Sequence, residues 1–183
     1  MQRGNGMDIY QIWTTYNKQW SKYETLAFVG VLILVCIVMT VCVHRKKLSI
    51  VQAAAVLALV VFLGIVFGST VFTRTGTIRQ YELVPFWSWR DIIRYHDWTL
   101  LKENLLNCIL LLPVGVLLPV ITNHKIKWYQ ALAVGIFVSA IIEFSQLIFM
   151  RGLFEWDDMI HNGLGCMIGS LFANIFVKKE NRG

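Results

Sequence analysis

Long apolar stretches separated by short polar segments run along most of the chain. A helix of roughly 20 apolar residues crosses the hydrocarbon core of a bilayer. Five stretches with at most one ionisable acidic side chain each meet or approach that length, namely residues 25–43, 48–72, 105–122, 128–150 and 159–177. No segment shows the alternating polarity of a membrane β-barrel strand. The pattern therefore predicts an all-α membrane protein, a bundle of about five transmembrane helices.

Two further segments are amphipathic rather than uniformly apolar. Within residues 1–24, aromatic and aliphatic side chains recur at three- and four-residue steps, which is typical of a helix lying at the membrane surface. After Pro85, the side chains of Phe86, Trp89 and Ile93 share one helical face. We expect the second segment to be an outer interfacial helix that either anchors the chain passively or forms a lid over a membrane pocket.

Composition supports a membrane protein, and the distribution of charge suggests its orientation. The chain is 56% hydrophobic and 15% charged, which is too apolar for a soluble domain of this length. The net charge of +6 does not indicate nucleic acid as a partner, because basic residues concentrate in segments 44–47, 125–127 and 178–182. Five spans place all three segments on one side, which the positive-inside rule makes cytoplasmic. We therefore expect an external N-terminus and a cytoplasmic C-terminus.

One membrane domain is the economical interpretation, with four successive regions. Residues 1–24 form the N-terminal interfacial segment, 25–80 two apolar helices and their connection, 81–178 three further helices, and 179–183 a cytoplasmic tail. The first two spans carry almost nothing polar, whereas the last three contain Asn, Glu, Gln, His and Pro. Function is therefore expected in the second half.

The polar residues of the second half are expected to form one layer near the outer membrane face. Glu143 is the only acidic residue inside a predicted span, and an intramembrane ionisable residue is a functional candidate by default. A short turn makes the last two spans an antiparallel hairpin, so depth can be matched by counting residues from that turn. The candidate polar layer comprises Asn107, Glu143, Gln146, Arg151, Asp157, Asp158, His161 and Asn162.

Specific contacts within this layer follow from its residue types. We expect Glu143 to be neutral, because desolvation disfavours the carboxylate and no basic side chain lies at its depth. A neutral carboxyl can donate to Asn162 or Asn107. The turn between the last two spans should bring Arg151 and Asp158 together. At least one of Asp157 and Asp158 should cap the start of the last helix, where carboxylates favour the positive end of the dipole.

Small residues and cysteines are interpreted as packing groups. Gly165 and Gly169 are four residues apart and would let a neighbouring backbone approach closely. The four cysteines lie in predicted spans without metal-ligand spacing. Asp157, Asp158 and His161 offer an alternative metal site, but a firm site normally needs three or four converging ligands. We therefore expect no metal and no cofactor.

The motifs of the second half resemble those of the VanZ-like family of bacterial membrane proteins. The resemblance covers roughly residues 82–177 and rests on an ordered set of motifs: 83–86, Asn107 with 111–115, 143–146, Arg151 with 154–158, 162–165 and Gly169. One extra residue between Arg151 and Phe154, and Glu155 where Asp is common, depart from the family pattern. The resemblance implies reduced susceptibility to teicoplanin-type lipoglycopeptide antibiotics, which act at the outer face on cell-wall precursors. It does not supply a reaction.

Three functions are consistent with these features. The preferred one is a multi-pass cell-membrane factor, not an enzyme, whose outward-facing intramembrane polar pocket binds a lipid or another amphiphile. Its partners would be membrane lipids and either a lipid-linked cell-wall precursor or the lipoglycopeptide. The first alternative is a membrane enzyme that modifies a lipid or precursor headgroup, with Glu143 or Asp158 as acid or base and His161 assisting. The second is a proton-coupled carrier that uses Glu143, which the absence of an inverted repeat disfavours.

Overall fold

The chain folds almost entirely into helices, as the apolar pattern predicted. A computed structural model describes residues 20–74 and 78–177. Most of the predicted interfacial helix in residues 1–24 lies outside these residues. In chain order the elements are α2 (Lys22–His44), α3 (Ile50–Phe67), the π-helical turn η1 (Gly68–Phe72), β1 (Gln80–Glu82), α4 (Trp87–Tyr95), α5 (Trp98–Leu110), α6 (Leu112–Thr122), α7 (Trp128–Phe149), β2 (Leu153–Glu155) and α8 (Trp156–Ala173).

Local sequence signals set the beginnings of the first two helices. Ser21 caps α2, where its side chain accepts from the backbone of Glu24 and the Glu24 carboxylate accepts from the Ser21 amide. Ser49 and Gln52 form the same reciprocal pair at the start of α3. Each capping box satisfies backbone donors that have no partner within the helix. The long apolar runs that follow then continue as uninterrupted helix.

Four helical stretches are long and apolar enough to cross a membrane: Lys22–His44, Ile50–Phe72, Trp98–Thr122 and Trp128–Phe149. The third stretch begins before its predicted start at residue 105, because Asp97 caps α5. The Asp97 side chain accepts from the backbone amides of Thr99 and Leu100. It also divides into α5 and α6 at Leu111. Pro113, two residues later, cannot donate a backbone hydrogen bond, which accounts for the division.

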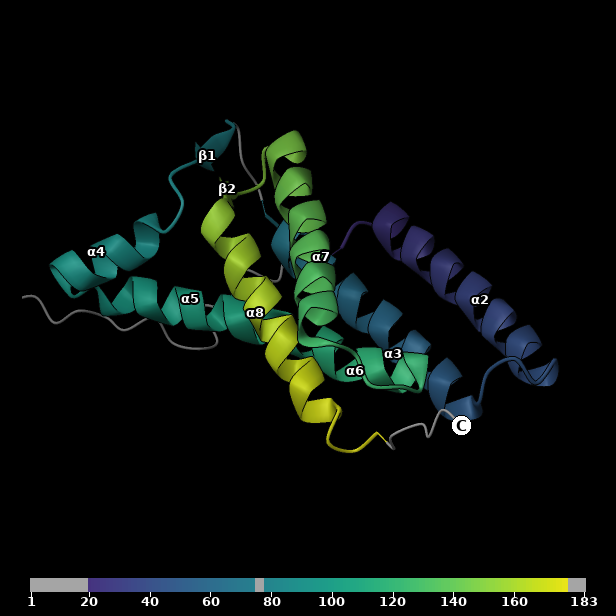
Figure 1. Cartoon of the computed structure of the whole chain (residues 1–183). Coiled ribbons are helices and arrows are strands. Elements are labelled where there is room, and N and C mark those ends of the chain that lie inside the picture. Colours follow the sequence, from purple (N-terminus) through teal and green to yellow (C-terminus); the bar gives the residue numbers. More distant parts are fainter. Residues whose placement is uncertain (1–19, 75–77, 178–183) are drawn as a thin grey trace, which may run out of the picture.

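Helix α8 occupies the place of the fifth predicted span but is not among these four. Its first two turns contain Asp157, Asp158, His161 and Asn162, and these side chains lower its hydropathy. Its 18 residues still extend about 27 Å at 1.5 Å per residue. The helix runs back beside α7 and also packs on α5 and α6 (Figure 1). Ten of its residues are buried, so α8 is the central helix of the bundle.

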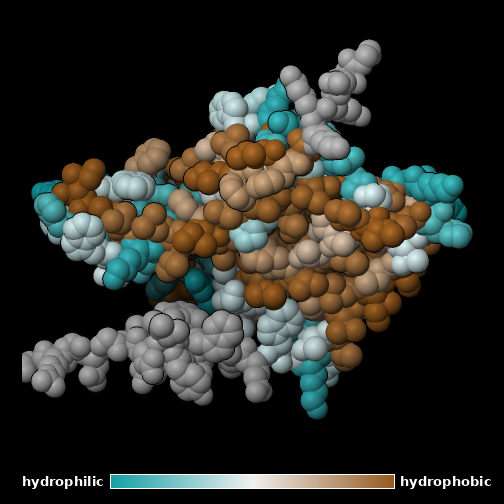
Figure 2. All heavy atoms as spheres, turned by 90° about the horizontal axis from the view of Figure 1, so that it is seen from below, coloured by the Kyte–Doolittle hydropathy of each residue, from teal (hydrophilic) through white to brown (hydrophobic). Residues whose placement is uncertain are grey.

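The exterior of the bundle is apolar. Helix α2 has no buried residue and contacts the rest of the described chain chiefly through α3. Figure 2 shows hydrophobic side chains over most of one face, with hydrophilic side chains gathered toward its left and right edges. An apolar exterior with a polar interior is the arrangement that lipid as solvent favours. The protein is thus an all-α membrane protein.

Glycines allow the helices around α8 to pack backbone against backbone. A Cβ atom on Gly165 would lie 1.7 Å from the carbonyl oxygen of Cys108 in α5. A Cβ atom on Gly169 would lie 2.2 Å from the carbonyl oxygen of Leu112 in α6. Neither position can accept a larger residue unless the helices separate. This close packing places the polar start of α8 directly against its neighbours.

A two-stranded parallel sheet joins two segments distant in sequence. Strand β1 pairs with β2 in the register Tyr81 to Phe154 and Glu82 to Glu155. The Phe154 side chain is buried, whereas Tyr81 is exposed. The pairing places the segment after η1 beside the turn between α7 and α8, which is the end of the bundle that holds the polar layer.

Candidate functional site

The sequence-predicted polar residues gather where α7 ends and α8 begins. Glu143, Gln146, Asp157, His161 and Asn162 are buried, and Asn107, Arg151 and Asp158 are partly buried. They come from α5, α7, α8 and the turn before β2. We call this set the polar layer. Its internal contacts differ in several respects from those expected.

Asp157 holds the amphipathic helix α4 against α8. One carboxylate oxygen accepts from the backbone N–H of Phe86 at 2.5 Å. The other accepts from the backbone N–H of Ser88 at 3.2 Å and from its hydroxyl at 2.6 Å. Phe86 begins α4 in the left-handed region without a side-chain cap. The prediction that Asp157 or Asp158 caps α8 is therefore wrong, because the Asp157 carboxylate caps α4, and α8 begins with no side-chain cap.

His161 also contacts α4. The indole Nε1–H of Trp89 donates to His161 Nε2 at 2.7 Å. An indole nitrogen can only donate, so His161 Nε2 must accept and the ring proton of a neutral histidine lies on Nδ1. His161 Nδ1 is buried without a hydrogen-bond partner. The ring thus presents an unsatisfied N–H donor inside the protein.

Glu143 and Asn162 have separate partners. The Glu143 carboxylate accepts from the backbone N–H of Glu155 at 3.1 Å. The amide nitrogen of Asn162 donates to the hydroxyl of Ser139 at 2.8 Å, and its oxygen Oδ1 is buried without a partner. The predicted bond of Glu143 to Asn162 or Asn107 is wrong. Ser139, one helical turn before Glu143, takes the amide donor of Asn162, and Asp158 takes that of Asn107. Asn162 therefore retains an unused acceptor.

Arg74 is a basic neighbour of this layer that sequence reasoning missed. Its charge acts on both Glu143 and Asp158, although no ion pair between them is present in the described residues. A Cβ atom on Gly152 would lie 3.2 Å from a terminal nitrogen of Arg74 and 3.0 Å from the side-chain oxygen of Gln146. Arg74 Nε is buried without a partner. The reasoning for a neutral Glu143 overlooked this basic side chain, because η1 packs on α7 and brings Arg74 near Glu143.

Arg151 and Gln146 donate hydrogen bonds to backbone carbonyl groups at the end of η1. Arg151 therefore does not pair with an acidic side chain. Arg151 Nη1 donates to the carbonyl oxygen of Phe72 at 2.6 Å, and Gln146 Nε2 donates to that of Thr70 at 3.1 Å. The last carbonyls of a helix lack partners within it, which makes them acceptors for such donors. The predicted pair of Arg151 and Asp158 is wrong. Within residues 20–74 and 78–177, the one ion pair is internal to α4.

Asp158 is paired with an amide on α5. Asn107 Nδ2 donates to Asp158 Oδ1 at 2.5 Å. This bond joins α5 to the first turn of α8, and Gly165 continues the same contact deeper in the bundle. Two members of the predicted polar layer are thus brought into direct contact.

Glu155, beside the layer in β2, has an unusual proton affinity. Partial burial, followed by the negative charges of Asp158, Asp157, Glu103 and Glu82, together raise the pKa of Glu155 to about 7. Its carboxyl group therefore exchanges a proton near neutral pH. It is a candidate acid or base outside the spans.

No group of three His, Cys, Asp or Glu side chains suited to a metal ion occurs in the part of the chain that the structure describes. Three buried polar atoms of the layer and of its neighbour Arg74 have no hydrogen-bond partner: Arg74 Nε, His161 Nδ1 and Asn162 Oδ1. Buried polar atoms normally have a partner in the protein or in water. A ligand with polar groups could satisfy them.

Comparison with known proteins identifies the family. The profile described as VanZ/LLP1 matches residues 28–177, which is most of the chain. The protein belongs to the VanZ/LLP1 family. The match extends the resemblance from residues 82–177 to include both apolar helices of the first half. A search of curated proteins and a search of solved structures each found no match for this VanZ/LLP1 protein.

Three other residues of the site were missed from the sequence. Ser88 and Trp89 bind Asp157 and His161, and Asn104 donates to the Ser88 hydroxyl at 3.1 Å. Ser88 and Asn104 are buried. Little in the sequence indicated that these residues belong to the site, because they lie in a segment expected at the outer surface. A serine and an asparagine, each on an otherwise amphipathic helix, do not by themselves indicate burial.

Proposed function

We propose that this VanZ/LLP1 protein lowers susceptibility to teicoplanin-type lipoglycopeptides by binding the polar part of an amphiphile in the polar layer. The amphiphile would be a membrane lipid, a lipid-linked cell-wall precursor or the lipoglycopeptide itself. The observation that supports this most is the set of unpartnered buried atoms, Arg74 Nε, His161 Nδ1 and Asn162 Oδ1.

These atoms are two donors and one acceptor. Leaving a buried polar group unsatisfied costs about 1–3 kcal/mol, so a ligand that bonds to it gains affinity. A headgroup with phosphate, hydroxyl or amide groups offers both acceptors and donors. Arg74 is suited to phosphate or carboxylate oxygens. The combination favours a polar headgroup over a purely apolar ligand.

Helix α4 suits the recognition of an amphiphile beside this layer. Its polar start is held by Asp157, whereas Ile93 on its apolar face is 74% exposed. An amphipathic helix with an exposed apolar face favours the interface between headgroups and acyl chains. An amphiphile could therefore place its headgroup at the layer while its apolar part lies along α4. This supports a lid role over passive anchoring.

The proposed orientation places the polar layer outside and the C-terminus in the cytoplasm. The basic segments 44–47 and 125–127 lie at the opposite end of the bundle, which supports it through the positive-inside rule. A reporter fused after Arg182 should be active only if it functions in the cytoplasm. An externally active reporter at this position would reverse the orientation.

Glu143→Gln in a deletion strain tests the functional proposal. Glutamine keeps the oxygen that accepts from the Glu155 amide but cannot ionise, so it should insert and accumulate normally. We expect it to lose most of the resistance to teicoplanin, measured as minimal inhibitory concentration. Arg90→Gln, a matched change at an exposed site of α4, should retain resistance. Full resistance of the Glu143 variant at normal abundance would remove this carboxyl from the functional groups.

A membrane enzyme acting on a lipid or precursor headgroup is the second candidate. It is favoured by Glu155, whose carboxyl group exchanges a proton near neutral pH beside Asp158, as a general acid or base requires. Lipid extracts of deletion and complemented strains separate the two candidates. A lipid species that appears or disappears with the gene supports the enzyme, whereas an unchanged lipid profile together with changed teicoplanin susceptibility supports binding.

A further inference from the structure

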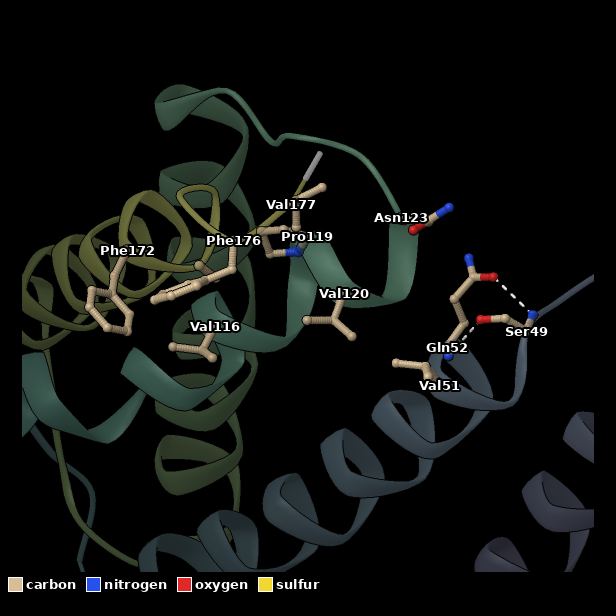
Figure 3. A pocket seen from close by; sticks show the side chains of 11 residues that line it. Ser49, Val51, Gln52, Val116, Pro119, Val120, Asn123, Phe172, Phe176 and Val177 are labelled. Carbon is tan, nitrogen blue, oxygen red and sulfur yellow. Dashed lines mark hydrogen bonds between the residues drawn. The ribbon is translucent and has the colours of Figure 1, made fainter. Parts of the chain in front are cut away.

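A cleft lies at the opposite end of the bundle from the polar layer. It opens between the start of α3, the second half of α6 and the last turns of α8, with a volume of about 430 Å³ (Figure 3). This volume lies within the ~300–1,000 Å³ of small-molecule sites. Its apolar wall consists of Val51, Val116, Val120, Phe172 and Phe176.

The cleft suits a hydrocarbon chain that enters from the bilayer. Phe172 and Phe176 are 58% and 74% exposed, so the wall is accessible from the apolar exterior of the bundle. Burying an acyl chain against these side chains gains about 25 cal/mol per Å² of apolar area removed from water. In lipid that gain is small, because acyl chains are equally apolar. The cleft alone would therefore hold a lipid only weakly.

The mouth of the cleft is polar and fixed in position. Ser49, Gln52 and Asn123 line it. The Gln52 side chain accepts from the Ser49 amide at 3.0 Å and donates to the carbonyl oxygen of Ile121 at 2.9 Å. These bonds join the start of α3 to the end of α6. The Gln52 side chain at the mouth is thus fixed between the two helices.

Basic residues flank the mouth, and none of the described residues that line the cleft is acidic. Lys47 is two residues before Ser49, and Lys125 is two residues after Asn123, so each lysine backbone lies within about 7 Å of the mouth. The segments 44–54, 116–127 and 172–177, which supply the cleft and its flanks, contain no Asp or Glu. The mouth therefore attracts an anion.

From this combination we infer that the cleft binds an anionic phospholipid, with one acyl chain between α3, α6 and α8 and the phosphate at the basic mouth. Basic pockets between transmembrane helices on the cytoplasmic side are suited to anionic headgroups. The site is separate from the polar layer and does not depend on the function proposed for it.

Native mass spectrometry of the purified full chain tests this inference. The chain, released from detergent, is offered equal amounts of phosphatidylglycerol and phosphatidylcholine with identical acyl chains. We expect phosphatidylglycerol adducts to exceed phosphatidylcholine adducts by up to about 25-fold, from two lysines. A lysine near the surface contributes roughly fivefold to binding an anionic lipid. The double variant Lys47→Gln and Lys125→Gln should therefore bind the two lipids almost equally.

Two further variants locate the site. Val120→Trp fills the cleft and should reduce adducts of both lipids, whereas Lys22→Gln, at the other end of α2, should leave the preference unchanged. Equal binding by the unaltered chain would overturn the inference, as would a preference that survives in the double lysine variant. If Val120→Trp does not fold, the lysine variants alone decide, because both residues lie in connections outside the helices.

Discussion

Replacing Asp157 should release helix α4 from the bundle without unfolding the spans. Its carboxylate accepts from the Phe86 amide, the Ser88 amide and the Ser88 hydroxyl, and the residue is 1% exposed. Alanine removes all three bonds and leaves two backbone donors at the start of α4 without an acceptor. Helices α7 and α8 keep their extensive contact with each other, so the loss should be local.

The size of the effect follows from the bonds lost. A hydrogen bond to a charged group contributes about 1.5–3 kcal/mol, and three bonds that share one carboxylate are not additive. We take about 4 kcal/mol for Asp157→Ala, which changes the ratio of docked to undocked α4 roughly a thousandfold. Asparagine can still accept from Phe86 and donate to the Ser88 hydroxyl. It leaves the Ser88 amide without an acceptor and reverses the bond to the Ser88 hydroxyl, so Asp157→Asn should cost about 1–3 kcal/mol.

Hydrogen exchange of the α4 amides measures this equilibrium directly. Protection of residues 90–95 should fall in the order wild type, Asn, Ala, while α7 stays protected. Asp91→Ala is the matched control, because that carboxylate pairs with the exposed Arg90 on the same helix. If the Ala variant keeps the α4 protection of the wild type within about threefold, Asp157 does not hold α4 and the assigned cap is wrong.

Three further changes test other parts of the structure. Gly165→Ala forces a Cβ atom to 1.7 Å from the Cys108 carbonyl oxygen, so its melting temperature should fall by several degrees or more, and an unchanged value would contradict the close packing. The folded-state pKa of Glu155, about 7 against the usual 4.5, means that stability falls as pH rises through this window, and thermal unfolding of Glu155→Gln should show a flatter decline. Trp89→Phe removes the donor to His161 and should reduce α4 protection about fivefold, since one neutral hydrogen bond contributes about 1 kcal/mol; unaltered protection would exclude a role for this bond in docking.

The apolar pattern predicted the helices well because lipid leaves few alternatives for an uncharged stretch of this length. The runs at 25–43 and 48–72 became α2 and α3 with η1, and the face shared by Phe86, Trp89 and Ile93 became α4. The start of α5 was missed, because Lys102 and Glu103 make its first turns look like a loop. A periodic pattern of apolar residues predicts the apolar part of a helix. It does not predict that the helix begins earlier, among charged residues.

The candidate site was predicted as a layer, and its contacts were not. Counting residues from the hairpin turn matched depths within α7 and α8, since both helices are regular. Arg74, Ser88 and Trp89 come from a segment whose path is set by the β1–β2 pairing and by Asp157. Neither the strand pairing nor the contacts of Asp157 can be predicted from the periodicity or the residue spacing of the sequence. The contacts of Arg151 were missed for the same reason, because its acceptors are backbone carbonyls, and any sequence has those.

The polar start of α8 also bears on how the chain is inserted into the membrane. Asp157, Asp158 and Asn162 would each oppose entry of this helix into lipid alone. At the helix end each aspartate costs less than the roughly 2.5–3.5 kcal/mol that it would cost at the bilayer centre. Their partners on α4, α5 and α7 all precede α8 in the sequence. During synthesis those helices leave the ribosome first, and α8 then enters an assembly that already presents hydrogen-bond donors and acceptors. Its insertion should therefore be slow or incomplete when the earlier helices are removed, even though its own sequence is unchanged.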